Sequence, residues 1–187
     1  MKEDSRHSPD FELVSESVEG DRTREPWIWY FGYGSNMDRN TFLGRRRMRS
    51  LETRTGVLEG WRLTFDLAVG KGERGVANIR RARQAQVWGV LWQITQRDAA
   101  FLDRTEGVHM GAYRRQSVDV RGTDGAVVRG FTYRSDRGRP GRKPSRRYLG
   151  LLLAGARQHG LPDPYVTWLR SLELAADERD AQQGKLF

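Results

Sequence analysis

The chain has 187 residues, which is long enough for one domain with a sizeable core. It contains no cysteine, so disulfides and thiolate metal sites are excluded and a reducing compartment is compatible. No stretch approaches the roughly 18 apolar residues of a membrane span, and residues 1–26 lack the apolar segment of a signal peptide. We therefore expect a cytoplasmic protein that is not bound to a membrane.

Arginine supplies most of the net charge of +9. Three arginine clusters, at 45–49, 80–83 and 137–147, would permit nucleic-acid binding. They lack an interleaved aromatic platform and the signature of a known nucleic-acid-binding module. We therefore favour a solvated surface with paired acids over a nucleic-acid partner.

Residues 1–26 are polar without sustained periodicity and predict a disordered tail, so the single folded domain is expected over 27–187. The aromatic run Trp27–Phe31 predicts a buried strand. Two glycines follow within residues 30–36 (YFGYGSN), and a short helix is expected next, capped by Asn36 or by Asp38. A strand, a glycine turn and a helix start together favour an anion-binding site.

The next segment is rich in β-favouring residues. Short strands are expected at 54–60, 61–69, 76–80 and 87–94, with a turn at 59–60 and a loop at 70–75. The strand at 87–94 is nearly all apolar, so we expect it to be buried on both faces.

Helices and a hairpin complete the chain. Thr95 is expected to cap a helix that ends at Gly107. The Asp-Gly step at 124–125 predicts a tight turn between strands at 115–121 and 126–134. After a basic loop, helices are expected at 146–159 and 162–174. Many short strands followed by helices predict an α+β fold with a small curled sheet or barrel.

Common cofactor motifs are not supported. Residues 32–37 begin like a dinucleotide-binding fingerprint, but Met37 occupies the third glycine position. No phosphate-binding loop with a Gly-Lys-Ser/Thr ending is present, and His7, His109 and His159 fit no metal spacing. The sequence motifs therefore support neither a classical organic cofactor nor a metal site.

Glu106 lies in the last turn of an expected helix, at the negative end of the helix dipole. It also follows the most buried strand, and both effects would raise its pKa toward the range of a useful general base. The local residues alone favour a simpler interpretation, in which Glu106 is exposed and its interaction with the helix dipole is mildly unfavourable.

Several polar residues are candidates for a pocket wall, although each has an ordinary structural interpretation. Tyr33, Tyr113, Tyr133 and Tyr148 could each present a hydroxyl, but a single tyrosine is more typical of the core or its rim. Ser35 is more typical of a turn than of a nucleophile, and Asn36 fits a helix cap as well as a ligand.

Together, the motifs of the chain resemble those of γ-glutamylcyclotransferases. The resemblance covers roughly residues 28–173 and is carried, in order, by Tyr33–Met37 (YGSNM), Val76–Ile79 (VANI), Val87–Val90 (VWGV), Asp103–Val108 (DRTEGV), Gly111–Tyr113 (GAY), Tyr148 and Gly155–Pro162 (GARQHGLP). A YGS turn alone would be weak evidence for this resemblance, but the motifs YGSN, VWGV and EGV in this order are specific evidence.

The resemblance implies a small mixed β-barrel flanked by helices and a cofactor-independent activity. The implied reaction is intramolecular aminolysis of a γ-glutamyl amide, which releases 5-oxoproline and an amine or amino acid. The glutamate of the EGV motif, here Glu106, is implied as general base. The residues implied around the substrate are Tyr30, Phe31, Gly32, Tyr33, Gly34, Ser35, Asn36, Tyr113 and Tyr148.

Asn36 favours the branch that acts on γ-glutamyl amino acids over the glutathione-specific branch, in which the turn usually reads YGSL. The leaving amine stays undetermined, and a specialised γ-glutamylated metabolite fits as well. A non-catalytic binding module on the same scaffold is the alternative interpretation. The expected partner is a small γ-glutamyl substrate, and a homodimer stays open.

Overall fold

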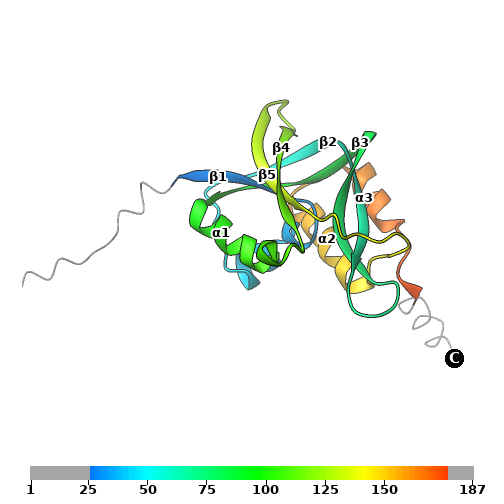
Figure 1. Ribbon diagram of the computed structural model, residues 1–187. Helices are drawn as coiled ribbons and strands as arrows, with labels where there is room; N and C mark the ends of the chain where they lie inside the picture. Colours follow the sequence, from blue (N-terminus) through cyan, green and yellow to red (C-terminus); the bar gives the residue numbers. More distant parts are fainter. Residues whose placement is uncertain (1–25, 177–187) are drawn as a thin grey trace, which may run out of the picture.

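The structure is a computed structural model that describes residues 26–176 (Figure 1). Five strands close into a barrel in the order β1-β3-β2-β4-β5. Their bounds are β1 Trp27–Gly32, β2 Thr53–Ala68, β3 Gly75–Thr95, β4 Arg114–Gly122 and β5 Val127–Arg134. Neighbouring strands are antiparallel except β1 and β5, which run parallel and pair at Tyr30 and Phe131.

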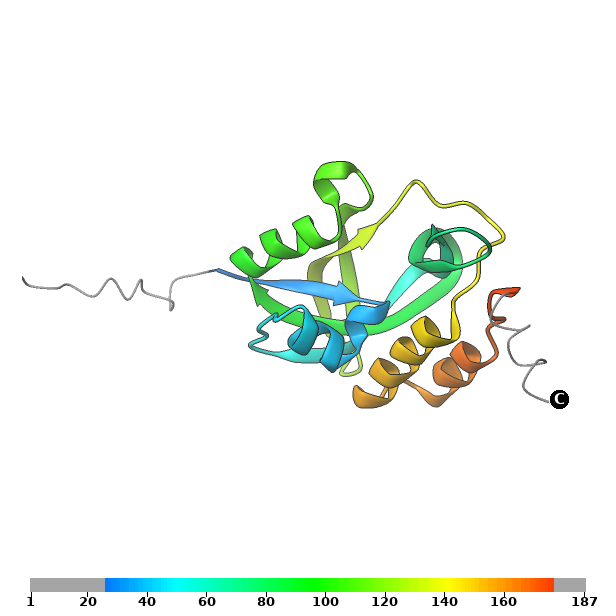
Figure 2. The same cartoon turned by 90° about the horizontal axis from the view of Figure 1, so that it is seen from below.

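The helices lie outside the barrel. Three are α-helical (α1 Gln96–Thr105, α2 Arg146–Gln158, α3 Asp163–Arg170) and three are short (η1 Ser35–Met37, η2 Asn40–Arg45, η3 Val108–Met110). Figures 1 and 2 show α1 on one side of the barrel, with α2 and α3 side by side on the other. The predicted α+β fold with a small mixed barrel flanked by helices is confirmed.

Strand β3 provides much of the core, as its apolar sequence predicted. Trp92 is fully buried and its ring stacks on Phe42 with centroids 4.6 Å apart, while Phe42 stacks on Tyr30 at 5.6 Å. Burying a large apolar side chain stabilises a fold by about 1.5–3 kcal/mol. This aromatic column therefore holds the segment after β1, including η1 and η2, against the barrel wall.

The strand boundaries of the β2–β3 hairpin differ from the prediction. The expected turn at 59–60 is a bulge inside one continuous β2, where Gly60 has a φ of 73° and the pairing register shifts. The expected strands at 76–80 and 87–94 are one 21-residue strand. Between them, Arg81 and Gln86 pair with Trp61 and Glu59 of β2, and the register shifts between these two pairs, so residues 82–85 continue the strand without a β2 partner.

The predicted helix after β1 is also corrected in detail. Asp38 is the capping side chain, since its Oδ1 accepts from the Thr41 N–H at 2.7 Å and the Thr41 hydroxyl at 2.8 Å. Asn36 faces a cavity instead. At the other end of the chain, α3 ends at Arg170, four residues earlier than expected.

The predicted tail lies outside the described residues apart from Pro26, and so does the end of the predicted domain at 177–187. Within 26–176, no helix combines the length and apolar character that crossing a membrane requires. Several arginines there pair with acids, as Arg80 does with Asp66 at 2.7 Å. Arg81 instead stacks on the Trp61 ring at 4.1 Å.

Candidate active site

A cavity of about 180 Å³ opens where the end of β1, η1, the start of β3 and the end of α1 meet. It is lined by Tyr30, Tyr33, Gly34, Ser35, Asn36, Arg46, Val76, Ala77, Glu106, Tyr113, Tyr133 and Tyr148. All sequence-predicted site residues except Phe31 and Gly32 are therefore brought together. Phe31 is fully buried in the core. The Gly32 carbonyl oxygen packs against Gly89 of β3, where an added Cβ on Gly89 would lie 2.5 Å from that oxygen.

Two glycines allow the turn to approach its neighbours. A Cβ on Gly34 would lie 3.0 Å from the Tyr148 hydroxyl and 3.1 Å from the Ala77 Cβ. A Cβ on Gly155 of α2 would lie 2.5 Å from the Met37 carbonyl carbon. The glycines thus let α2 and β3 contact the η1 backbone and hold the turn at the cavity wall.

Glu106 is positioned by the end of α1. Its N–H donates to the Leu102 carbonyl at 2.8 Å, and Gly107 follows with a φ of 66°, the left-handed conformation that ends the helix as predicted. The side chain is 13% exposed, and its Oε1 lies 2.8 Å from Arg46 Nη2 and 3.3 Å from Asn36 Nδ2. The carboxylate is therefore held at the cavity by two partners.

Arg46 is a site residue that the sequence analysis missed. Its Nη1 donates to the Thr105 hydroxyl at 2.6 Å while Nη2 pairs with Glu106, so the guanidinium bridges two neighbouring residues at the end of α1. The sequence placed Arg46 in a solvated cluster, whereas its side chain is only 23% exposed. The guanidinium therefore fixes the position of the Glu106 carboxylate at the cavity wall.

Asn36 connects the glycine turn to Glu106. Its Nδ2 donates to the Tyr30 hydroxyl at 2.8 Å as well as to the carboxylate, and its carbonyl accepts from Trp92 Nε1 at 3.1 Å. The residue is 6% exposed, and its Oδ1 has no hydrogen-bond partner in the described part of the chain. A buried amide oxygen without a donor is costly, so the site is suited to a ligand that brings an N–H group.

Three of the five cavity tyrosines donate to fixed protein acceptors. Tyr33 donates to the Tyr133 carbonyl at 2.5 Å, and Tyr113 donates to the Ala77 carbonyl at 2.9 Å. Tyr133 donates to Asp103 Oδ1 at 2.8 Å. These hydroxyl protons are already used to fix the cavity wall.

The other two hydroxyls accept hydrogen bonds from the protein. Tyr30 accepts from Asn36, and Tyr148 accepts from the Ala77 N–H at 3.1 Å and from Ser35. Their protons can therefore be donated to a bound ligand.

The tyrosines act as donors rather than bases. Burial raises the pKa of all five cavity tyrosines. The negative charge of Glu106 adds to this effect on the pKa of Tyr30. The hydroxyls therefore stay protonated, and Glu106 is the cavity group suited to accept a proton.

The sequence made Tyr133 a candidate for the pocket wall, and the structure places it in the cavity lining together with Val76 and Ala77. Arg115 Nε donates to Asp103 Oδ1 at 2.7 Å, the same oxygen that accepts from Tyr133. Contacts between strands and helices of this kind have no local sequence signal.

The described residues contain no group of three or more His, Asp or Glu side chains arranged to hold a metal ion. His159 lies against the Trp92 ring, with centroids 5.0 Å apart, and is not among the cavity residues. The chemistry of the cavity is thus that of one carboxylate, one guanidinium, an amide and several hydroxyls.

Comparisons with known proteins match this architecture. Residues 86–169 match the AIG2-like family. A γ-glutamylcyclotransferase from Mus musculus is 29% identical over 168 residues, covering 86% of this chain and 87% of the relative. The γ-glutamylcyclotransferase from Homo sapiens is 29% identical over 153 residues, covering 77% of this chain and 78% of the relative.

Solved structures show the same fold. A structure named γ-glutamyl cyclotransferase superposes with a TM-score of 0.70 at 23% identity, covering 85% of this chain and 99% of the other. An uncharacterized Homo sapiens protein superposes with a TM-score of 0.71 at 26% identity, covering 84% and 98%. The motifs, the barrel and the sequence relatives agree: the chain is similar to γ-glutamylcyclotransferases over most of its length, and these relatives support an enzyme of this kind.

Proposed function

We propose that this protein cleaves γ-glutamyl amino acids or γ-glutamyl amines by intramolecular attack of the substrate α-amine on its γ-carbonyl, with Glu106 as general base. The products are 5-oxoproline and the free amine. The observation that carries the proposal is a mostly buried carboxylate, held by Arg46 and Asn36, in a cavity lined with tyrosine hydroxyls.

The charged groups of the cavity complement the γ-glutamyl group. The substrate α-ammonium brings the N–H donor that the buried Asn36 Oδ1 lacks, and it lies next to the Glu106 carboxylate. The substrate α-carboxylate pairs with Arg46, because a guanidinium has five N–H donors and can bind a second anion beside Glu106.

Glu106 relays protons from the attacking nitrogen to the leaving nitrogen. It takes a proton from the α-ammonium, and the freed amine attacks the γ-carbonyl carbon to close the five-membered ring. This proton passes to the leaving nitrogen as its bond to that carbon breaks, and the ring nitrogen gives up a second proton as the lactam forms, so the amine departs as an ammonium and no water is consumed. Both contacts from Arg46 and Asn36 go to Oε1, so we assign Oε2 as the oxygen that carries the proton.

The tetrahedral oxyanion needs hydrogen-bond donors that are already in place. Tyr148 and Tyr30 are the two cavity tyrosines whose protons are not donated to the protein in the described residues. Holding the glutamyl chain folded for ring closure is a positioning task for the surrounding wall.

The test is 5-oxoproline release from γ-glutamyl-alanine, γ-glutamyl-lysine, glutathione and a γ-glutamylated amine. We expect Glu106→Gln to lower kcat by about 10²- to 10⁴-fold, the range of general acid–base catalysis. Glu52→Gln is the matched control, since Glu52 is exposed and pairs with Arg54 away from the cavity. Undiminished release by a folded Glu106→Gln protein would remove Glu106 from the mechanism.

A further inference from the structure

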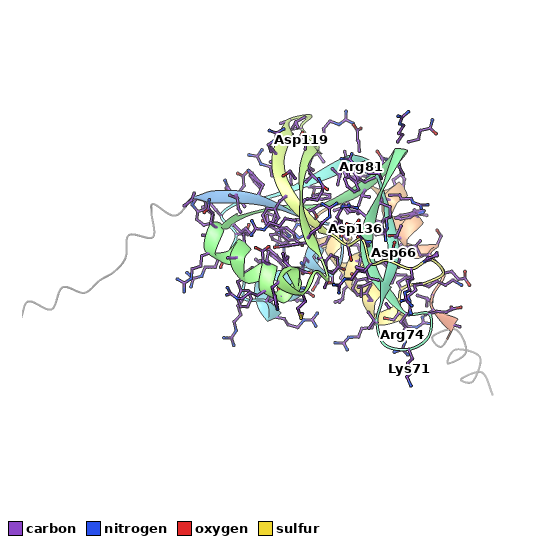
Figure 3. The ribbon with its side chains drawn as sticks, viewed as in Figure 1. Asp66, Lys71, Arg74, Arg81, Asp119 and Asp136 are labelled. Atoms are coloured by element: carbon purple, nitrogen blue, oxygen red, sulfur yellow. The ribbon has the colours of Figure 1, made fainter. Side chains whose placement is uncertain are left out.

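A second cleft, of about 350 Å³, adjoins the catalytic cavity. It lies between the lower end of the β2–β3 hairpin and the start of α2. It is lined by Val69, Arg74, Gly75, Val76, Ser145, Arg147, Tyr148 and Leu151. Figure 3 shows Arg74 at this end of the hairpin, near Lys71.

The cleft and the catalytic cavity share two wall residues. Val76 and Tyr148 line both spaces, and the Tyr148 hydroxyl is held by the Ala77 N–H at 3.1 Å. The two spaces therefore meet at the wall formed by Val76 and Tyr148, and a molecule bound at the Tyr148 hydroxyl lies next to the second cleft.

The catalytic cavity is too small for a whole γ-glutamyl dipeptide. Its volume of about 180 Å³ is below the roughly 300–1,000 Å³ of pockets that enclose a complete drug-sized ligand. The γ-glutamyl half uses the groups around Glu106, so the leaving half needs a neighbouring space. The second cleft is the neighbouring space that shares the wall at Tyr148.

The walls of the second cleft combine apolar and cationic side chains. Val69 and Leu151 are apolar and partly exposed, and Arg74 and Arg147 add positive charge. No Asp or Glu within residues 26–176 is part of this lining. Such walls favour a ligand with an apolar portion and a carboxylate, and they disfavour a second ammonium group.

We propose that this cleft binds the leaving half of the substrate and selects γ-glutamyl amino acids that have an apolar side chain and a free carboxylate. The side chain packs on Val69 and Leu151, and the carboxylate pairs with Arg147, supported by Arg74. The inference rests on the proposed function, since it assigns the amine half of the same substrate.

The experiment compares kcat/KM for four substrates that differ only in the leaving half: γ-glutamyl-leucine, γ-glutamyl-alanine, γ-glutamyl-lysine and γ-glutamyl-3-methylbutylamine. The last is the leucine compound without its carboxylate. We expect leucine to exceed alanine by about tenfold, the lower end of what methylene groups contribute in an apolar pocket. Lysine and the amine should both fall below leucine.

Arg147→Gln tests the carboxylate contact. It should lower kcat/KM for γ-glutamyl-leucine by about two- to fivefold, the size of an exposed ion pair, and leave the 3-methylbutylamine compound unchanged. Arg146→Gln is the matched control, because Arg146 is an exposed neighbour in the same helical turn that does not line the cleft. Leu151→Ser should reduce the preference for leucine over alanine.

Binding to the Glu106→Gln protein separates this inference from the proposed function. Calorimetry with intact γ-glutamyl-leucine should give a Kd that Arg147→Gln raises by the same factor, whether or not the bond is cleaved. Turnover that depends on Glu106 but shows no leucine preference and no Arg147 effect overturns this inference alone. Absence of both turnover and binding for every compound overturns the proposed function and this inference together.

Discussion

Protonation of His159 is expected to make the stability of this protein depend on pH. Burial and, to a smaller extent, the nearby charge of Arg39 lower the pKa of the imidazole from 6.5 to about 4. A hydrogen bond to the Met37 backbone and the charge of Asp38 act in the opposite direction without overcoming these effects. The ring Nε2 is buried and has no hydrogen-bond partner within residues 26–176, so a proton added there would have no acceptor.

The magnitude follows from proton linkage. The His159 pKa is lower in the folded state than in the unfolded state, so between about pH 4 and 6.5 the unfolded chain binds more protons at this residue. The free energy of unfolding therefore rises with pH across this window and falls as the solution is acidified. The full pKa shift corresponds to about 3 kcal/mol in the free energy of unfolding. Because the His159 ring is only half buried, we expect solvent screening to reduce this contribution to about 1–2 kcal/mol.

The assay is urea unfolding at half-unit steps from pH 4 to 7.5. His159→Phe keeps a ring against Trp92 but cannot be protonated, so its free energy of unfolding should depend less on pH than that of the unmodified protein. His109→Gln, an exposed histidine, should leave the profile unchanged. Equal slopes for His159→Phe and the unmodified protein would refute the linkage.

Four further substitutions test the packing of α2, the cap of α1 and the role of the Tyr148 hydroxyl. Gly155→Ala should destabilise the fold by about 1–3 kcal/mol in thermal unfolding, because the added Cβ meets the backbone of Met37. Gly150→Ala in the same helix is the control: its Cβ points into open space, so the variant should be neutral or stabilised by up to about 1 kcal/mol. Thr95→Ala removes the side-chain cap of α1 and should cost about 1 kcal/mol by the same measurement; an unchanged midpoint would mean that the cap contributes nothing. Tyr148→Phe should lower kcat by about 10²-fold and, because the buried Ala77 N–H loses its acceptor, should also destabilise the fold by about 1–3 kcal/mol; unchanged turnover by the folded variant would exclude the Tyr148 hydroxyl as an oxyanion donor.

Local sequence patterns were sufficient for most elements of the fold. The aromatic run before Gly32, the Thr95 cap, the Gly107 terminus and the Asp-Gly hairpin each lie where the sequence placed them, because these signals act within a few residues. The merging of two expected strands into β3 was not predictable in this way. Its middle is held by the pairing of Arg81 and Gln86 with β2 on either side of a register shift, which is a tertiary interaction.

The candidate site was predictable where a motif marks it and not elsewhere. The glycine turn and Glu106 belong to motifs, and the structure brings them to one cavity. Arg46 lies 60 residues from Glu106 in a cluster of arginines that all look alike in the sequence. Only the docking of η2 against the end of α1 distinguishes it, through contacts to Thr105 and Glu106.

Closure of the barrel between β1 and β5 has a consequence for how activity is gained during folding. The Thr132 hydroxyl donates to the Phe31 carbonyl, and Tyr33 donates to the Tyr133 carbonyl, so each of these bonds joins residues about a hundred positions apart. Contacts this distant in sequence form slowly, because the chain must lose loop entropy before they contribute. The hairpins and helices can assemble earlier from local contacts. During refolding, the return of 5-oxoproline release should therefore lag behind the return of secondary structure, with a delay set by the seam between the first and last strands.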